Sequence, residues 1–142
     1  TININLKGAW LCMKYELEQM LKQGSGSIVN CASIAGVVGF TGIPAYTASK
    51  HGIIGLTKTA ALENAKTGVR INAVCPGVIQ TPMVDRFTGG KTEAANQLAS
   101  GAPIGRIGQP QEIADAVVWL CSNQASFITG HPMVIDGGWV AQ

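Results

Sequence analysis

Two short, uncharged apolar segments do most to limit what this chain can fold into. "IVNCA" (residues 28–32) and "INAVC" (residues 71–75) are rich in β-branched residues, and each is too short for a stable helix. Apolar side chains on both faces are typical of strands in a parallel sheet that helices cover on both sides. We therefore predict two buried strands, the first ending near Ser33 and the second ended by Pro76 and Gly77.

Helical segments stand before, between and after these strands. Apolar residues at helical spacing predict an amphipathic helix over residues 3–22, which the glycines and serines of 24–27 end. Pro44 suits the first turn of a second helix, which is expected to run to about Lys66. Pro110 begins a third helix in the same way.

The remaining segments complete an alternating order of elements. "PMVID" (residues 132–136) reads as a last short strand, and residues 78–109 as a loop-like excursion with one short helix over 92–100. The order helix, strand, helix, strand, helix, strand, joined by right-handed crossovers, predicts an α/β fold. We expect one domain that forms part of a doubly wound parallel sheet, with helices on both of its faces.

Composition and charge argue against several classes of function. Charged residues make up 13% of the chain, the net charge is +2 and the chain has no basic run, so we do not expect a nucleic-acid partner. Residues 23–49 carry no charge and are longer than the about 20 residues that span a bilayer. Asn30, Pro44 and several glycines interrupt this segment, so we expect no membrane contact.

The four cysteines are far apart in the sequence and form no CxxC pair. We therefore expect free thiols of a reducing, cytoplasmic compartment, and no metal site.

A candidate site follows from the strand ends and from one tyrosine. Ligands of such folds bind at the carboxyl ends of the strands, where Ser33 and residues 76–81 are expected to lie. Tyr46 and Lys50 are four residues apart, so a helix places both on one face within reach of each other. The start of the second helix brings this pair to the same rim of the sheet.

The motifs together resemble those of the short-chain dehydrogenase/reductase family, in family order and over essentially the whole sequence. They are "NLKG" (5–8), "IVNCAS" (28–33), "YTASK" (46–50), "NAVCPGVIQTPM" (72–83), "GQPQEIADAVVWLCS" (108–122), "ITG" (128–130) and "DGG" (136–138). The resemblance implies a Rossmann fold and an oxidoreductase that transfers a hydride between NAD or NADP and a small alcohol or ketone.

The resemblance assigns four catalytic positions, Asn5, Ser33, Tyr46 and Lys50. Tyr46 would donate or accept the proton, Ser33 would hydrogen-bond the substrate oxygen, and Asn5 would hold a water that links the lysine to solvent. An ordinary phenol, with a pKa of about 10, is a poor base at neutral pH, and nearby positive charge favours its ionised form. The ammonium of Lys50 and the oxidised nicotinamide would supply that charge. The alternative for Asn5 is a residue at the entry of the helix.

The same resemblance assigns the cofactor contacts. They fall on Tyr46, Lys50, Pro76, Gly77, Ile79 and Thr81. Any sharp exit from a strand also needs residues such as Pro76 and Gly77. Met83 and Phe87 would belong to a lid over the substrate, or equally to the core.

Residues 1–142 contain no glycine-rich phosphate loop and no residue that would choose between NAD and NADP. We therefore expect the C-terminal part of one NAD(P)-binding Rossmann domain, which lacks the N-terminal phosphate loop. On this interpretation the 142 residues alone should not bind NAD(P).

The first two helices carry more apolar and small residues than one sheet face requires, which with the resemblance implies a homodimer or homotetramer. The residues concerned are Ala9, Trp10, Gly52, Gly55, Ala60 and Ala61. One alternative function is a truncated, non-catalytic chain that acts only by association with itself or a relative. Another is a sugar-nucleotide epimerase or dehydratase, which the "PGVIQT" segment and the early "DGG" end disfavour.

Overall fold

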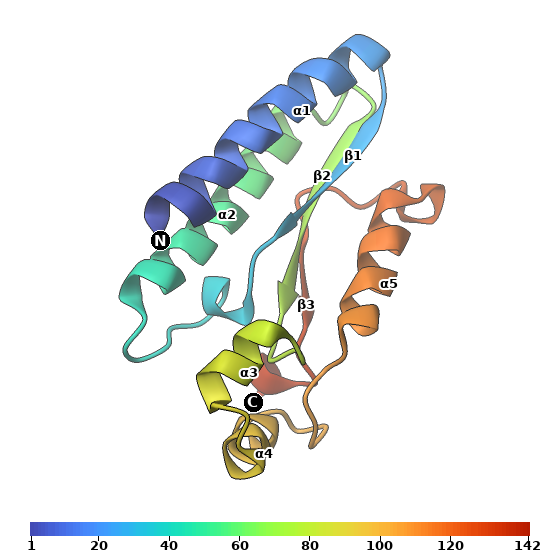
Figure 1. Cartoon of the computed structure of the whole chain (residues 1–142). Helices are drawn as coiled ribbons and strands as arrows, with labels where there is room; N and C mark the ends of the chain where they lie inside the picture. Colours follow the sequence, from blue (N-terminus) through green and yellow to red (C-terminus); the bar gives the residue numbers. More distant parts are fainter.

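The computed structural model describes all 142 residues apart from the side chain of Thr92. Its centre is a three-stranded parallel sheet in the order β1-β2-β3, formed by β1 (Gly26–Cys31), β2 (Val69–Pro76) and β3 (Pro132–Ile135). The register pairs Gly26 with Val69 and Ala73 with Pro132. The predicted α/β class and the parallel sheet are therefore confirmed (Figure 1).

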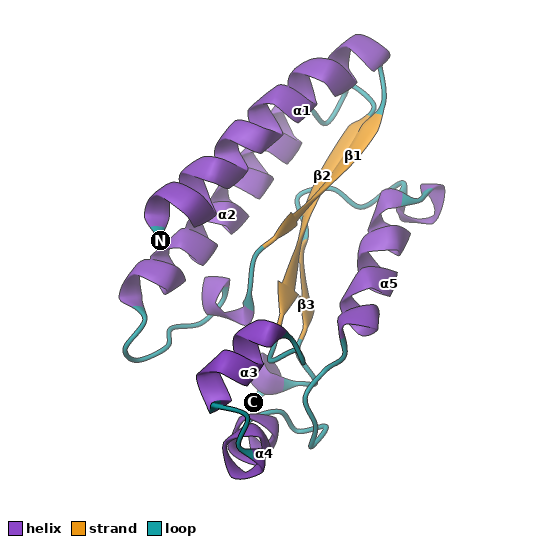
Figure 2. Cartoon of the chain, in the orientation of Figure 1, coloured by secondary structure: helices purple, strands orange, loops and turns teal.

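Helices cover both faces of this sheet, as predicted (Figure 2). One face carries the π-helical turn η1 (Asn3–Gly8), α1 (Ala9–Gln23) and α2 (Pro44–Glu63), and the other carries α5 (Pro110–Cys121). The two short helices α3 (Pro82–Thr88) and α4 (Thr92–Ser100) lie beyond the carboxyl ends of the strands. Three 3-10 turns complete the chain: η2 (Ile34–Gly36), η3 (Asn123–Ala125) and η4 (Trp139–Ala141).

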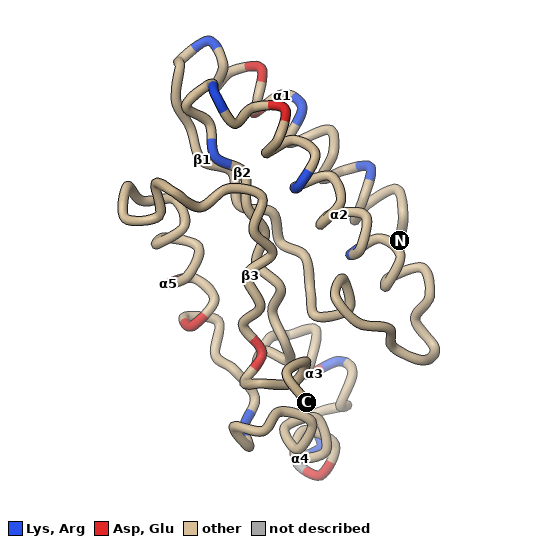
Figure 3. The backbone as a smooth tube through the Cα atoms, turned by 180° about the vertical axis from the view of Figure 1, so that it is seen from behind, with Lys and Arg blue, Asp and Glu red and all other residues tan. Residues whose placement is uncertain are grey.

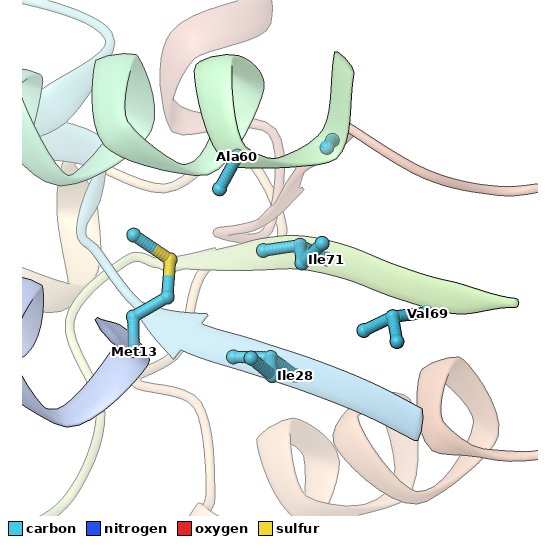
Figure 4. Close-up of a cluster of buried hydrophobic side chains, with 6 residues drawn as sticks. Met13, Ile28, Ala60, Val69 and Ile71 are labelled. Carbon is cyan, nitrogen blue, oxygen red and sulfur yellow. The ribbon is translucent and has the colours of Figure 1, made fainter. Parts of the chain in front are cut away.

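Side chains of β2 alternate between the two helical layers, as the period of a strand requires. Ile71, Ala73 and Cys75 are fully buried on the side of α1 and α2, and Val74 is buried against Leu120 of α5. Figure 4 shows the first of these clusters, in which Met13 of α1 lies over the strands. The central strand is thus buried on both of its faces, and this packing fixes the position of its carboxyl end.

Polar residues at the start of β2 join the α5 side to the sheet. The guanidinium of Arg70 donates to the carbonyls of Leu120, Ser122 and Ile128 at 2.8, 3.0 and 3.3 Å. The Asn72 amide donates to the Ile128 carbonyl at 2.9 Å. These bonds satisfy buried polar groups and hold the connection between α5 and β3.

The predicted elements are present, with several differences. Residues 3–8, expected within one α-helix, form the π-helical turn η1, and α2 ends at Glu63, three residues before its predicted end. Helix α3 was not predicted, because seven residues are too few for a periodic pattern; Pro82 begins it and Gly89, at φ 61°, ends it. β1 ends at Cys31, two residues before the predicted end. Trp10 is 45% exposed although it follows the apolar spacing of its helix.

Two further observations concern the distribution of basic residues and the length and polarity of the helices. Lys and Arg are spread over α1, α2 and the segments around α3 and α4 rather than gathered in one patch (Figure 3). Within the described residues, every helix is too short or too polar to cross a bilayer.

Candidate active site

Ser33 lies at the carboxyl end of β1, in register with the end of β2. The Ala32 N–H donates to the Val74 carbonyl at 2.9 Å, so Ser33 stands level with the last residues of β2. Its hydroxyl oxygen accepts a hydrogen bond from the Ala35 N–H at 3.1 Å and caps the turn η2. The hydroxyl proton of Ser33 is not used in this bond, so it can be donated to another oxygen.

The turn after Ser33 packs directly on α2. A Cβ added to Gly36 would lie 2.7 Å from the Lys50 carbonyl oxygen, closer than any side chain can approach. Only glycine allows this contact without a shift of backbone. Ser33 is therefore held against the turn of α2 that carries Tyr46 and Lys50.

The Lys50 ammonium joins this turn of α2 to the end of β1. It donates to the Cys31 carbonyl at 2.9 Å and lies 5.5 Å from the centre of the Tyr46 ring. Lys14 and Tyr15 on α1 make a ring contact at the same distance, on an exposed surface. The ring contact alone is therefore not distinctive, whereas the bond to the strand end fixes the position of Lys50.

Asn5 is joined to the backbone of Tyr46 through Ser49. The Asn5 amide donates to the Ser49 hydroxyl at 3.3 Å, and this hydroxyl donates to the Tyr46 carbonyl at 2.6 Å. Asn5 lies inside η1, whose N-cap is Ile2, so its side chain does not cap the helix. Ser49 is completely buried and was not among the site residues predicted from the sequence. The available signal was a small hydroxyl residue three positions after the tyrosine, one helical turn further along the same face.

The segment from Pro76 to Thr81 leaves β2 beside the end of β3. The Gly77 N–H donates to the Ile135 carbonyl at 2.9 Å, and a Cβ at Gly77 would lie 2.8 Å from the Cα of Asp136. Close packing on the end of β3 therefore requires glycine at position 77. The Thr81 hydroxyl donates to the Ile79 carbonyl at 3.2 Å.

Ile79 forms an isolated parallel bridge with Gly108. The Gly108 N–H donates to the Val78 carbonyl at 3.0 Å, and the Gln80 N–H donates to the Gly108 carbonyl at 2.9 Å. In this parallel hydrogen-bond pattern, Gly108 bonds to the residues on either side of Ile79 and not to Ile79 itself. The N–H and carbonyl of Ile79 therefore face away from Gly108.

Two other candidate chemistries receive no support from the site. Burial raises the pKa of the Cys75 thiol, and the Ser33 N–H opposes this only in part, so Cys75 is an uncharged core residue and a poor nucleophile. Among the residues that the structure describes, no cluster of three His, Cys, Asp or Glu side chains is arranged to hold a metal ion.

Met83 and Phe87 are exposed on α3, at 63% and 81%, so the interpretation of these two as core residues is wrong.

The structure thus joins the four predicted catalytic residues through short contacts of η1, η2 and α2. The predicted cofactor segment leaves the neighbouring strand at the same edge of the sheet.

Several proteins with similar sequences are, by their names, dehydrogenases or reductases. Residues 1–140 match the family described as Enoyl-(Acyl carrier protein) reductase. Cyclohexanol dehydrogenase of Acinetobacter sp. (strain SE19) is 47% identical over 141 residues, which are 99% of this chain and 54% of that protein. A 2,5-dichloro-2,5-cyclohexadiene-1,4-diol dehydrogenase of Sphingobium indicum is 45% identical over 99% of this chain and 57% of its own length. The chain therefore spans about half the length of the curated relatives it matches.

Solved structures give the same result for the fold. Levodione reductase superposes with a TM-score of 0.95 at 39% identity, over 99% of this chain and 56% of that protein. ElxO, solved with NADP bound, gives a TM-score of 0.89 at 39% identity, over 97% and 56% of the two chains. A 4-hydroxyisoleucine dehydrogenase complexed with NADH gives 0.92 at 36% identity, over 99% and 58%.

Proposed function

This chain belongs to the short-chain dehydrogenase/reductase family, with its Rossmann fold, and from that premise we propose that the full-length protein transfers a hydride between NAD or NADP and an alcohol or carbonyl substrate. The observation that carries the proposal is the Lys50 ammonium bonded to the end of β1 beside Tyr46, with the Ser33 turn packed on the same helical turn. A tyrosine, a lysine and a serine at one sheet edge provide the proton donor, the positive charge and the orienting hydroxyl that carbonyl reduction needs.

The residues at this edge fit the nicotinamide end of the cofactor. The outward N–H and carbonyl of Ile79 are a donor and an acceptor of the kind that a carboxamide requires, and the Lys50 ammonium can donate to ribose hydroxyls. Pro76, Gly77, Thr81 and Tyr46 would complete this contact. When bound, the nicotinamide supplies the carbon that accepts or donates the hydride.

Each catalytic residue has a separate role in the proposal. The Tyr46 hydroxyl passes the proton to or from the substrate oxygen, and the Ser33 hydroxyl donates to that oxygen and stabilises its developing charge. Lys50 provides positive charge beside the phenol. Asn5, through Ser49, holds the first turn of α2 in place, and in the proposal it also binds a water that links Lys50 to solvent.

The names of several relatives narrow the expected substrates. The two relatives described above act, by their names, on hydroxyl groups of six-membered rings, as does a cis-4-hydroxycyclohexanecarboxylate dehydrogenase of Sinomonas cyclohexanicum. We propose that secondary alcohols on alicyclic rings, and the matching ketones, belong to the substrate class of the full-length protein.

Location and assembly are part of the same proposal. Cys12, Cys31 and Cys121 are exposed free thiols, which suits a cytoplasmic protein; cell fractionation would check this. We also propose a homodimer or homotetramer.

The test is an assay of the full-length protein with NAD or NADP and a panel that includes cyclohexanol. We expect saturable dinucleotide binding and an alcohol-dependent rise in reduced nicotinamide. A protein that bound no dinucleotide but still associated with itself would support the non-catalytic alternative instead.

A further inference from the structure

A bidentate ion pair lies at the N-terminus of α5, apart from the four proposed catalytic residues. The Arg106 guanidinium donates to both carboxylate oxygens of Glu112, at 2.8 and 2.6 Å. The same carboxylate accepts from the Gln109 N–H at 2.7 Å, as the N3 residue of a capping box. Three donors from one short segment therefore converge on Glu112.

The segment held in this way contains Gly108, the partner of Ile79. Gly108 lies between Arg106 and Gln109, which are both bonded to Glu112. Its two backbone hydrogen bonds, to the Val78 carbonyl and from the Gln80 N–H, fix which way the N–H and carbonyl of Ile79 face. A Cβ at Gly108 would lie 2.6 Å from Cδ1 of Ile79, so the two segments are in close contact.

Side-chain packing beneath this loop is incomplete. A pocket of about 70 Å³ is lined by Val78 and Ile79 of this loop and also by Arg106, Glu112 and Ile113. Side chains that line an unfilled space lack packing contacts on that side, so the position of the loop depends on its other contacts. The bonds through Gly108 and the Arg106–Glu112 pair are those contacts.

The pair is charged over the whole working range of pH. The hydrogen bonds from Arg106 and from the Gln109 N–H lower the pKa of Glu112 to about 2. The carboxylate therefore stays ionised at any pH at which a dehydrogenase is assayed, and pH does not switch the contact.

We propose that Arg106 and Glu112 are positioning residues for the cofactor: they hold Gly108 so that the Ile79 peptide groups face the nicotinamide carboxamide. This inference rests on the proposed function. It implies that breaking the pair weakens contact with the nicotinamide half of the dinucleotide and leaves the adenosine half unaffected.

The test uses Glu112→Gln in the full-length protein. Glutamine keeps an oxygen for the Gln109 N–H and loses the charge that binds Arg106. Arg106→Lys keeps the charge and loses the two-pronged geometry, so it should show a smaller effect in the same direction. Glu18→Gln, which breaks the exposed pair of Glu18 with Lys22 on α1, is the matched control.

Binding of NADH or NADPH is compared with binding of ADP-ribose or its 2′-phosphate, which lack the nicotinamide. We expect Glu112→Gln to weaken binding of the reduced dinucleotide by about two- to fivefold, the range of an exposed ion pair, with ADP-ribose binding unchanged. The cofactor KM should rise by a similar factor, and Glu18→Gln should match the wild type. If circular dichroism shows that Glu112→Gln is unfolded, the two ligands are compared on Arg106→Lys instead.

Equal losses for both ligands, or wild-type affinity for both, would overturn the positioning role. If the wild-type protein binds ADP-ribose and the dinucleotide normally, such a result overturns the positioning role alone and not the proposed function. A wild type that bound no dinucleotide at all would overturn both.

Discussion

Gly36 is the residue at which the Ser33 turn and α2 come closest. A methyl group there would meet the Lys50 carbonyl oxygen at 2.7 Å and the Lys50 carbonyl carbon at 2.9 Å. Both atoms are backbone, so neither can rotate away, and the turn and the helix would have to separate. The distance from Ser33 to Tyr46 and Lys50 therefore depends on the absence of one side chain.

We expect Gly36→Ala in the full-length protein to lower kcat/KM by about a hundredfold, because a shift of about 1 Å in a catalytic group costs that much. It should also destabilise the fold by about 1–3 kcal/mol through overpacking. Steady-state kinetics and urea unfolding measure the two effects.

Gly39→Ala in the same loop is the control, since a Cβ there would meet nothing within 4 Å and the φ of Gly39 is not positive. Wild-type kinetics for Gly36→Ala would show that this contact does not position the site.

The sequence predicts some of these residues better than others. Tyr46 and Lys50 follow from helical spacing, and Ser33 from its place at a strand end, because these relations are local. Ser49 carries a local signal, its spacing from Tyr46, but its contact with Asn5 and the contact of Gly36 with Lys50 join segments that are separated in the sequence. The sequence does not show these two contacts. The positions of Ser33, Tyr46 and Lys50 were predictable from the sequence. The contacts that hold them could be identified only in the folded structure.

Helices α1 and α2 show which part of the expected assembly surface remains free. Ala60 and Ala61 are 5% and 2% exposed and belong to the core against β2, so they are not available to a partner of this chain. Gly52 faces Leu6 of η1. Ile4 and Leu62, by contrast, are each 80% exposed on these helical segments. The composition of a helix thus overstates its free surface, because small residues also serve close packing on the sheet.

We expect the full-length protein to sediment as a dimer or tetramer at micromolar concentration, and Leu62→Lys to shift it toward smaller species, because a charge would enter an apolar contact. Val118→Lys changes an aliphatic residue of α5 that is 69% exposed on the opposite face of the sheet, and serves as the control. A wild-type protein that sedimented only as a monomer would contradict the expected assembly.

At the scale of the molecule, the carboxyl edge of the sheet collects the whole candidate site. Strands β1 and β2 deliver Ser33 and the Pro76–Thr81 segment, and α2 begins at the same edge with Tyr46. This arrangement was predictable from the alternation of short apolar strands with helices, since parallel crossovers bring all strand ends to one side. Helix α3 and the bridge between Ile79 and Gly108 were not predictable, because they arise within an irregular segment whose contacts lie elsewhere in the chain.

The central claim is that Tyr46 transfers the proton, and a comparison of the two tyrosines tests it most directly. Tyr46→Phe and Tyr15→Phe each remove one hydroxyl, and each tyrosine has a lysine ammonium 5.5 Å from its ring. In the full-length protein we expect Tyr46→Phe to lower kcat by about 10²- to 10⁴-fold while dinucleotide affinity stays near that of the wild type. Tyr15→Phe should leave both unchanged. Near-full turnover by Tyr46→Phe would contradict the proposed mechanism.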